Sequence, residues 1–131
     1  MSKPKAFIFD FWGVIFRDGA VDTSLLATIA TLKQQHVTAI LSNMGRYSFD
    51  EYMNAADQAA FTDIFLSGET GLHKPRPEAF AHIVEQLDVA ASECFFVDDV
   101  ADNVQAAEAL GMQAMLFTDA PALIEKLQEL Q

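Results

Sequence analysis

The chain has 131 residues, of which 51% are hydrophobic and 21% charged; this length and composition predict a single domain over residues 1–131. Nineteen acidic residues against eight Lys and Arg leave a formal net charge of -11, which excludes nucleic acid as a partner because most of the surface would repel a polyphosphate backbone. No apolar run approaches the length that crosses a bilayer, so we expect no membrane association.

The N-terminus and the cysteine content indicate a cytoplasmic protein. The first residues lead at once into a short apolar stretch, which lacks the length and the cleavage pattern of a signal peptide. The one cysteine, Cys94, cannot form an internal disulfide and lies in an apolar run. We interpret it as a small buried residue and not as a catalytic thiol.

Short β-like runs alternate with helical patterns from one end of the chain to the other. The runs that we expect to form strands are residues 6–10, 37–42, 64–67, 94–98 and 113–117. Apolar residues at helical spacing predict helices around residues 25–32, 80–87, 100–110 and 123–130. This alternation predicts a three-layer, doubly wound α/β fold of Rossmann-like type, with a parallel sheet of about five strands.

Sequence signals mark several helix ends. Gly111 stands where the helix around residues 100–110 should end, and Asp119 and Pro121 are typical of the cap and first turn of the last helix. Ser48 and Glu51 have the spacing of a capping box, from which we predict a further helix over residues 48–60, although its apolar residues are poorly periodic.

Polar residues follow the ends of the predicted strands. In an open α/β sheet, ligands bind outside the carboxyl ends of the strands, so these residues are the candidates for chemistry. Three ends of strands and one Pro-rich loop contribute to the set, which is Asp10, Ser42, Asn43, Lys74, Asp98 and Asp99. We expect all of them to lie along one edge of the sheet.

The three aspartates predict a metal site. Asp98 and Asp99 bring two adjacent carboxylates to one strand end, and Asp10 brings a third. Crowded carboxylates repel each other unless a cation neutralises them, and oxygen ligands with retained waters are what Mg²⁺ prefers. The alternatives are chance clustering in an acidic chain and, for Asp10 alone, a turn cap at the end of a strand.

Ser42, Asn43 and Lys74 are suited to binding phosphate. The hydroxyl, the amide and the N–H groups of the following turn can hold phosphate oxygens, although Ser-Asn after a strand is often no more than a turn. Lys74 lies in a loop that Pro75 and Pro77 stiffen. An ammonium group held beside carboxylates could offset the charge of both the nucleophile and the phosphate.

In this order, the residues resemble the motifs of the haloacid dehalogenase superfamily, and the resemblance extends over about residues 6–118. It implies that Asp10 is the nucleophile of the first motif. Ser42, with Asn43, corresponds to the phosphate-binding second motif, and Lys74 to the catalytic lysine of the third, which also contacts phosphate. The segments from Ser67 to Pro77 and from Asp98 to Asn103 resemble the branch that contains dehalogenases and small-metabolite phosphatases.

The same resemblance implies a Mg²⁺ site and a covalent mechanism. Asp98 and Asp99 correspond to the acidic fourth motif, and the ligands would be Asp10, the main-chain carbonyl of Trp12, Asp98 and Asp99. Asp10 would attack the phosphorus of a small phosphorylated substrate to give an aspartyl-phosphate, which water then hydrolyses.

Trp12 is one departure from the family pattern. In the family, this position carries a second aspartate that acts as general acid and base, and an indole cannot transfer that proton. Because this help is typically worth about two to four orders of magnitude, we expect a slow enzyme or one restricted to good leaving groups. Asp18 is a speculative substitute, and a polar loop residue is its more ordinary interpretation.

The short length of two segments is the second departure from the family pattern. Residues 11–41 have room for a turn and one helix, and residues 44–73 are equally short, so we expect no cap domain and an open site. A neighbouring subunit of a homo-oligomer could cover it. Otherwise substrates would be selected by side chains such as Trp12, Phe16, Arg17 and Arg46, for each of which a core or surface role is an equal alternative.

Three functions therefore remain open. The leading one is a Mg²⁺-dependent phosphatase acting on a small phosphorylated metabolite. The second is a catalytically impaired domain, kept as a binding or oligomerisation module after the loss of both the acidic residue that Trp12 replaces and the cap domain. The third is a metal-free dehalogenase, whose branch carries an aromatic residue at this position; the retained Asp98-Asp99 pair argues against it.

Overall fold

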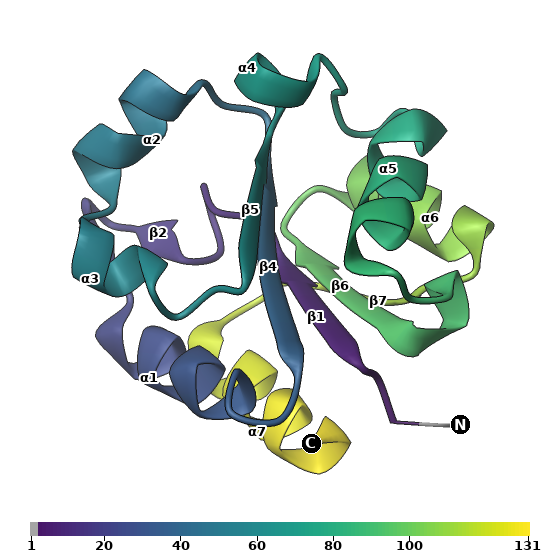
Figure 1. Ribbon diagram of the computed structural model, residues 1–131. Coiled ribbons are helices and arrows are strands. Elements are labelled where there is room, and N and C mark those ends of the chain that lie inside the picture. Colours follow the sequence, from purple (N-terminus) through teal and green to yellow (C-terminus); the bar gives the residue numbers. More distant parts are fainter. Residues whose placement is uncertain (1–2) are drawn as a thin grey trace.

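The computed structural model describes residues 3–131 and shows a central sheet of parallel strands flanked by helices on both faces (Figure 1). The sheet order is β5-β4-β1-β6-β7. In that order the strands are β5 (Asp63–Leu66), β4 (Val37–Ser42), β1 (Ala6–Phe9), β6 (Cys94–Asp98) and β7 (Gln113–Leu116). β1 lies in the middle, paired with β4 and β6, so the residue that follows it is close to the ends of both neighbours.

Alternating side chains of the strands form two separate apolar cores, one on each face of the sheet. Phe7 and Phe9 of β1 face the core that α1 (Thr23–Leu32) and α7 (Ala120–Leu130) cover. Ala6 and Ile8 face the core that α5 (Pro77–Leu87) and α6 (Ala101–Leu110) cover. Figure 1 shows one helix pair on each face of the sheet, which confirms the predicted three-layer fold.

Several helix ends agree with the sequence signals. The side chain of Asp119 accepts a hydrogen bond from the Ala122 N–H at 2.8 Å and caps α7, and a proline occupies its first turn. Gly111 ends α6 in a left-handed conformation with φ of 106°. Asp22, which had not been predicted as a cap, caps α1 in the same way and accepts a hydrogen bond from the N–H of Leu25 at 2.9 Å.

The helix predicted over residues 48–60 is wrong. The structure has two short helices there, α2 (Arg46–Tyr52) and α3 (Ala55–Gln58), and the N-cap of α2 is Gly45, without a side-chain bond, so Ser48 and Glu51 form no capping box. The chain extends at Met53, which ends α2. Asn54 then accepts a bond from the Asp57 N–H at 2.8 Å, which starts the new helix.

The segment after β1 contains a feature that the sequence analysis missed. A small hairpin, β2 (Phe16–Arg17) and β3 (Ala20–Val21), precedes α1, and its turn places Asp18 and Gly19 at positive φ. In the described chain, this hairpin and α1 are all that lies between β1 and β4, so no cap domain is present there. The remaining elements are α4 (Ser67–Thr70), which begins at the residue predicted to end β5, and the 3₁₀ helix η1 (Ala91–Glu93).

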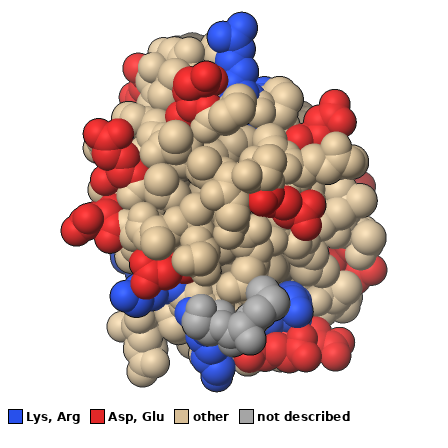
Figure 2. Space-filling model, turned by 90° about the vertical axis from the view of Figure 1, so that its right-hand side faces the viewer, with Lys and Arg blue, Asp and Glu red and all other residues tan. Residues whose placement is uncertain are grey.

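The distribution of charged side chains and the burial of Cys94 agree with what the sequence predicts. Figure 2 shows acidic side chains spread over the face formed by α5 and α6, with basic ones near the top and bottom of the view. Cys94 is buried at the start of β6, and burial raises the pKa of its thiol to about 11, as expected for an inert core residue. Within residues 3–131, no helix has both the length and the apolar character to span a bilayer.

Candidate active site

The carboxyl ends of β1, β4 and β6 surround a pocket of about 640 Å³. Its walls contain all six residues that the strand-end argument singled out, together with neighbours from the loops and helices that follow the strands. The lining residues are Asp10, Trp12, Ser42, Asn43, Met44, Gly45, Ser48, Lys74, Asp98, Asp99, Val100 and Asn103. A larger cavity, of about 870 Å³, lies by α7 and contains none of these residues.

Asp10 is held at the bottom of this pocket by the sheet itself. Its N–H donates to the Val97 carbonyl at 2.9 Å, so the backbone continues the ladder between β1 and β6 for one residue beyond the strand. The next residue, Phe11, is fully buried, and its carbonyl accepts bonds from Ile15 at 2.9 Å and Phe16 at 3.0 Å. A rigid turn therefore fixes the direction in which the Asp10 carboxylate points.

Asp10, Asp98 and Asp99 form the acidic cluster that the sequence predicted. One carboxylate oxygen of each lies within 4.8 Å of the others. Burial raises the pKa of Asp10 to about 7; Lys74 opposes this rise, while Asp98 and Asp99 add to it. Burial also raises the pKa of Asp99. Carboxylates that resist ionisation without a cation, and that offer converging oxygen atoms, have the chemistry of a Mg²⁺ site.

Gly13 allows Asp99 to reach this cluster. Its φ is +91°, and a Cβ atom at this position would lie 2.7 Å from the Cγ of Asp99. Only a residue without a side chain fits here, because the backbone conformation is left-handed and the carboxylate occupies the space of the missing Cβ. The shape of the turn after Asp10 therefore leaves room for Asp99, the residue that follows β6.

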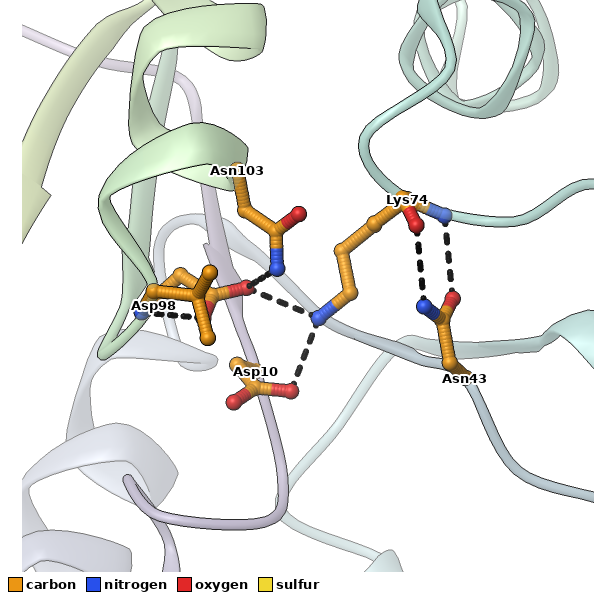
Figure 3. Close-up of polar contacts among 6 residues, drawn as sticks. Asp10, Asn43, Lys74, Asp98 and Asn103 are labelled. Atoms are coloured by element: carbon orange, nitrogen blue, oxygen red, sulfur yellow. Dashed lines mark hydrogen bonds and ion pairs between the residues drawn. The ribbon is translucent and has the colours of Figure 1, made fainter.

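Lys74 connects two of the three carboxylates. Its Nζ donates to Asp10 Oδ1 and to Asp98 Oδ2, each at 2.8 Å, and the side chain is almost fully buried. Figure 3 shows the lysine reaching from its loop to lie between Asp10 and Asp98. Since the group is desolvated and paired twice, its position is fixed before any ligand binds.

Asn43 holds the backbone of the lysine loop. Its Oδ1 accepts from the Lys74 N–H and its Nδ2 donates to the Lys74 carbonyl, both at 3.0 Å (Figure 3). This two-point contact joins the end of β4 to a loop that is 31 residues further along the chain. The side-chain amide of Asn43, predicted to contact phosphate, is thus engaged with Lys74, while Ser42 is buried beside the pocket at the end of β4.

Asp98 is the most enclosed of the three aspartates. Its Oδ2 accepts from Lys74 Nζ and, at 2.9 Å, from Asn103 Nδ2, while Oδ1 accepts from the Val100 N–H at 3.0 Å. A carboxylate oxygen can accept two bonds, so Oδ1 retains capacity for a metal ion. Asn103, buried in the first turn of α6, belongs to the motif that the sequence analysis quoted, but its contact with Asp98 was not predicted.

The four side chains named for substrate selection separate into two groups. Trp12 lines the pocket, and Phe16 stacks on it with ring centroids 5.1 Å apart. Arg17 instead bonds Asp22 and lies by the cavity near α7. Arg46 pairs with Glu69 on α4 at 2.9 Å and does not line the pocket.

Asp18 lies in the turn of the hairpin, exposed and outside the set of pocket residues. The structure thus favours its ordinary interpretation as a turn residue. Val100 and Ser48 do line the pocket and had not been predicted as site residues. Val100 directly follows Asp99, so proximity to the acidic motif was a signal for it, whereas Ser48 had been assigned to a helix cap.

The chain is similar to several known proteins. The sesquiterpene phosphatase astK of Aspergillus oryzae is 41% identical over 70 residues, which cover 53% of this chain and 36% of that protein. The chain thus spans well under half the length of this relative. An uncharacterized protein from Corynebacterium glutamicum is 27% identical, with a TM-score of 0.78 and coverage of 97% of this chain and 96% of that one.

A HAD family enzyme from Bacteroides thetaiotaomicron, solved as a mutant in complex with magnesium and inorganic phosphate, is 26% identical over 76% of this chain and 54% of that one, with a TM-score of 0.67. The profile of the family described as haloacid dehalogenase-like hydrolase matches residues 18–111. Because that match covers more than half of the sequence, and the fold agrees with it, this chain belongs to the haloacid dehalogenase-like hydrolases.

Proposed function

We propose that this chain is a Mg²⁺-dependent phosphatase for a small phosphorylated metabolite and that Asp10 is its nucleophile. The observation that carries the proposal is the convergence of three carboxylates within 4.8 Å, with the ammonium group of Lys74 bonded to two of them. The phosphatase name of one relative and the magnesium and phosphate in a solved structure support the same chemistry.

The metal ligands in this proposal are the carboxylates of Asp10, Asp98 and Asp99 and the main-chain carbonyl of Trp12. A bound Mg²⁺ would neutralise the carboxylates and the phosphoryl oxygens, which otherwise repel each other. The chain's own residues are already arranged to receive that charge, since Asp99 is exposed at the pocket and Asp98 Oδ1 keeps a free acceptor site. Asn103 keeps Asp98 in place while a ligand binds.

Asp10 performs the covalent step. A carboxylate oxygen attacks phosphorus, the bond from phosphorus to the ester oxygen breaks, and an aspartyl-phosphate and an alkoxide result. Lys74 lowers the cost of ionising Asp10 and faces the transferred group, and Ser42 with the N–H groups of the turn after β4 would hold the phosphoryl oxygens. Asn43 acts on this step indirectly, because it fixes the backbone of Lys74.

The weak point of this site is proton transfer. The alkoxide needs a proton, and water that attacks the aspartyl-phosphate must lose one. Trp12 occupies the position from which a carboxyl group would do both. Without that group, protons come from solvent, so substrates with good leaving groups should react faster than alkyl esters.

The direct test is release of phosphate from an aryl phosphate, measured with and without Mg²⁺ in wild type and Asp10→Asn. We expect turnover that requires both Mg²⁺ and Asp10. Asp102→Asn is a matched control, because Asp102 is an exposed aspartate on α6 outside the pocket. Turnover that persists in Asp10→Asn, or that falls equally in Asp102→Asn, would refute the assignment of the nucleophile.

One observation favours a second candidate, a catalytically impaired binding module. Trp12, which stands where the family pattern has an aspartate, is 51% exposed and lines the pocket. Such a module should bind Mg²⁺ and phosphate without hydrolysing any ester. Calorimetric binding of inorganic phosphate in the presence of Mg²⁺, together with no phosphate release from an activated ester, would favour it over the enzyme.

A further inference from the structure

The pocket has a polar bottom and an apolar rim. Asp10, Asp98 and Lys74 are buried and paired with one another, whereas three of the lining residues offer apolar surface: Trp12, Met44 and Val100. We call these three the apolar rim. Trp12 and Val100 are 51% and 48% exposed, among the most exposed large hydrophobic residues of the described chain. Apolar side chains gathered beside a reactive centre, and left in contact with water there, indicate a contact surface for a ligand.

Trp12 is held in place by other aromatic residues. Its ring stacks on Phe16 at 5.1 Å with an interplanar angle of 20°, and it meets Tyr52 of α2 edge to face at 5.1 Å. The Gly13 N–H, next in the chain, donates to the Phe16 carbonyl at 3.0 Å, which closes the turn that carries the indole. Since the ring is already ordered, a ligand that packs on its open side loses little affinity to ordering it.

The charges of the pocket disfavour a second anionic group on the ligand. Among its lining residues, Lys74 is the one cation, and its ammonium group already serves Asp10 and Asp98. The chain as a whole carries a formal charge of -11. A ligand with one phosphate can use the lysine and the metal site, but a further phosphate or carboxylate would meet a negative environment without a partner.

We propose that the substrates of this site are phosphate monoesters of uncharged, apolar alcohols, and that the alcohol portion packs on the indole of Trp12. The inference rests on the proposed phosphatase function, and it names the substrate class. In this proposal Trp12 binds substrate: the indole that cannot transfer a proton provides the surface on which the leaving group packs. Met44 and Val100 would contact the same portion from the other parts of the rim.

The test uses the fact that Trp12 is the only tryptophan of the chain. Its fluorescence therefore reports on the pocket alone, and binding can be measured without catalysis. Wild-type protein with Mg²⁺ is titrated with methyl-, butyl- and hexylphosphonate, which cannot be hydrolysed. We expect the emission to shift to the blue and the Kd to fall along the series, by up to about fourfold for each methylene group that leaves water.

Two variants decide whether the indole causes that trend. In Trp12→Ala, measured by calorimetry, the Kd should depend much less on chain length. Tyr47→Ala is the matched control, since Tyr47 is an exposed aromatic residue of α2, 82% exposed, outside the pocket. It should keep the full dependence on chain length.

The outcomes separate this inference from the phosphatase proposal. Equal Kd values for all three phosphonates, or a trend that survives intact in Trp12→Ala, would overturn the inference even if aryl phosphates are hydrolysed. A trend that depends on Trp12, without hydrolysis of any ester, would refute the enzyme and overturn the substrate class with it, leaving the indole only as a binding surface. A blue shift that protein concentration alone produces would show that a second copy covers the indole, and this too would overturn the inference.

Discussion

Replacing Gly13 with alanine should damage the metal site specifically. Gly13 and Gly19 both have positive φ, +91° and +81°, but their surroundings differ. A Cβ atom at Gly13 would overlap the carboxylate of Asp99, 2.7 Å from its Cγ, whereas a Cβ atom at Gly19 would have nothing within 4 Å. The two substitutions therefore share the backbone strain and differ in one contact.

The expected magnitudes follow from this pair. A left-handed backbone costs a residue with a side chain about 1–2 kcal/mol, so Gly19→Ala should lower the free energy of unfolding by that amount. Gly13→Ala has the same backbone strain, and its new side chain must also push Asp99 out of the acidic cluster. With one of three carboxylates displaced, we expect the affinity for Mg²⁺ to fall by about 10–100-fold, as is typical when the geometry of a metal site is disturbed.

The assay combines urea unfolding of both variants with calorimetric titration of Mg²⁺. We expect both variants to be less stable than wild type but only Gly13→Ala to bind Mg²⁺ more weakly. Equal Mg²⁺ affinity in wild type and Gly13→Ala would refute the reasoning, because the overlap leaves Asp99 no room in its present position. Equal weakening in both variants would show that backbone strain, and not the contact with Asp99, matters.

Three further predictions concern proton transfer, pH and the lysine loop. Trp12→Asp restores a carboxyl group at the position of the general acid, so kcat for alkyl phosphates should rise by about two to four orders of magnitude; an unchanged rate of phosphate release would mean that proton transfer does not limit the reaction. In the metal-free protein, the pKa of Asp10 is raised to about 7, so the folded state keeps a proton that the unfolded chain loses at lower pH. The free energy of unfolding should therefore fall as pH rises from about 4 to 7, by at most about 1.4 kcal/mol per pH unit, with a shallower slope in Asp10→Asn. Urea unfolding measures this slope, and a free energy of unfolding that rises over this range would contradict the prediction. Asn43→Ala removes both hydrogen bonds to the backbone of Lys74, so it should lower the free energy of unfolding by about 1–3 kcal/mol and also lower kcat. The control, Asn54→Ala, removes the cap of α3 and should lower the free energy of unfolding by about 1 kcal/mol while kcat stays unchanged.

The parts of the fold that were predictable depend on periodic burial. Each residue of β1 is fully buried, and the neighbouring strands and the four long helices have the apolar patterns that such burial requires. Since parallel strands need crossover helices, the layer arrangement followed from the order of the elements. The position of Asp10, Asp98 and Asp99 at one edge then followed from strand polarity, although the approach of their carboxylate oxygens to within 4.8 Å of one another did not.

The errors occurred where local signals compete. Ser48 and Glu51 have the spacing of a capping box, but α2 begins at Arg46, so both residues lie inside the helix. Asn54 provided a real cap, which divides the predicted helix in two. The hairpin at residues 16–21 has strands of only two residues, too short for an alternating pattern, although the Asp18-Gly19 pair is typical of such turns.

The contacts that define the site's detail join distant parts of the chain. Asn43 and Lys74 are 31 residues apart, and no pattern in the sequence indicates that the amide of one meets the backbone of the other. The same is true of Trp12 and Tyr52, whose rings meet edge to face although one residue follows β1 and the other is the last of α2. Sequence reasoning named residues that gather in one pocket, and the structure was needed to show what holds them there.

The central claim is that Asp10 becomes phosphorylated, and rapid acid quenching during turnover of a ³²P-labelled aryl phosphate tests it most directly. Because Trp12 cannot help water to attack the intermediate, the aspartyl-phosphate should accumulate. The claim predicts base-labile label on the peptide that contains Asp10, lost in Asp10→Asn and retained in Asp102→Asn. Turnover that leaves Asp10 unlabelled, or label on another residue, would contradict it.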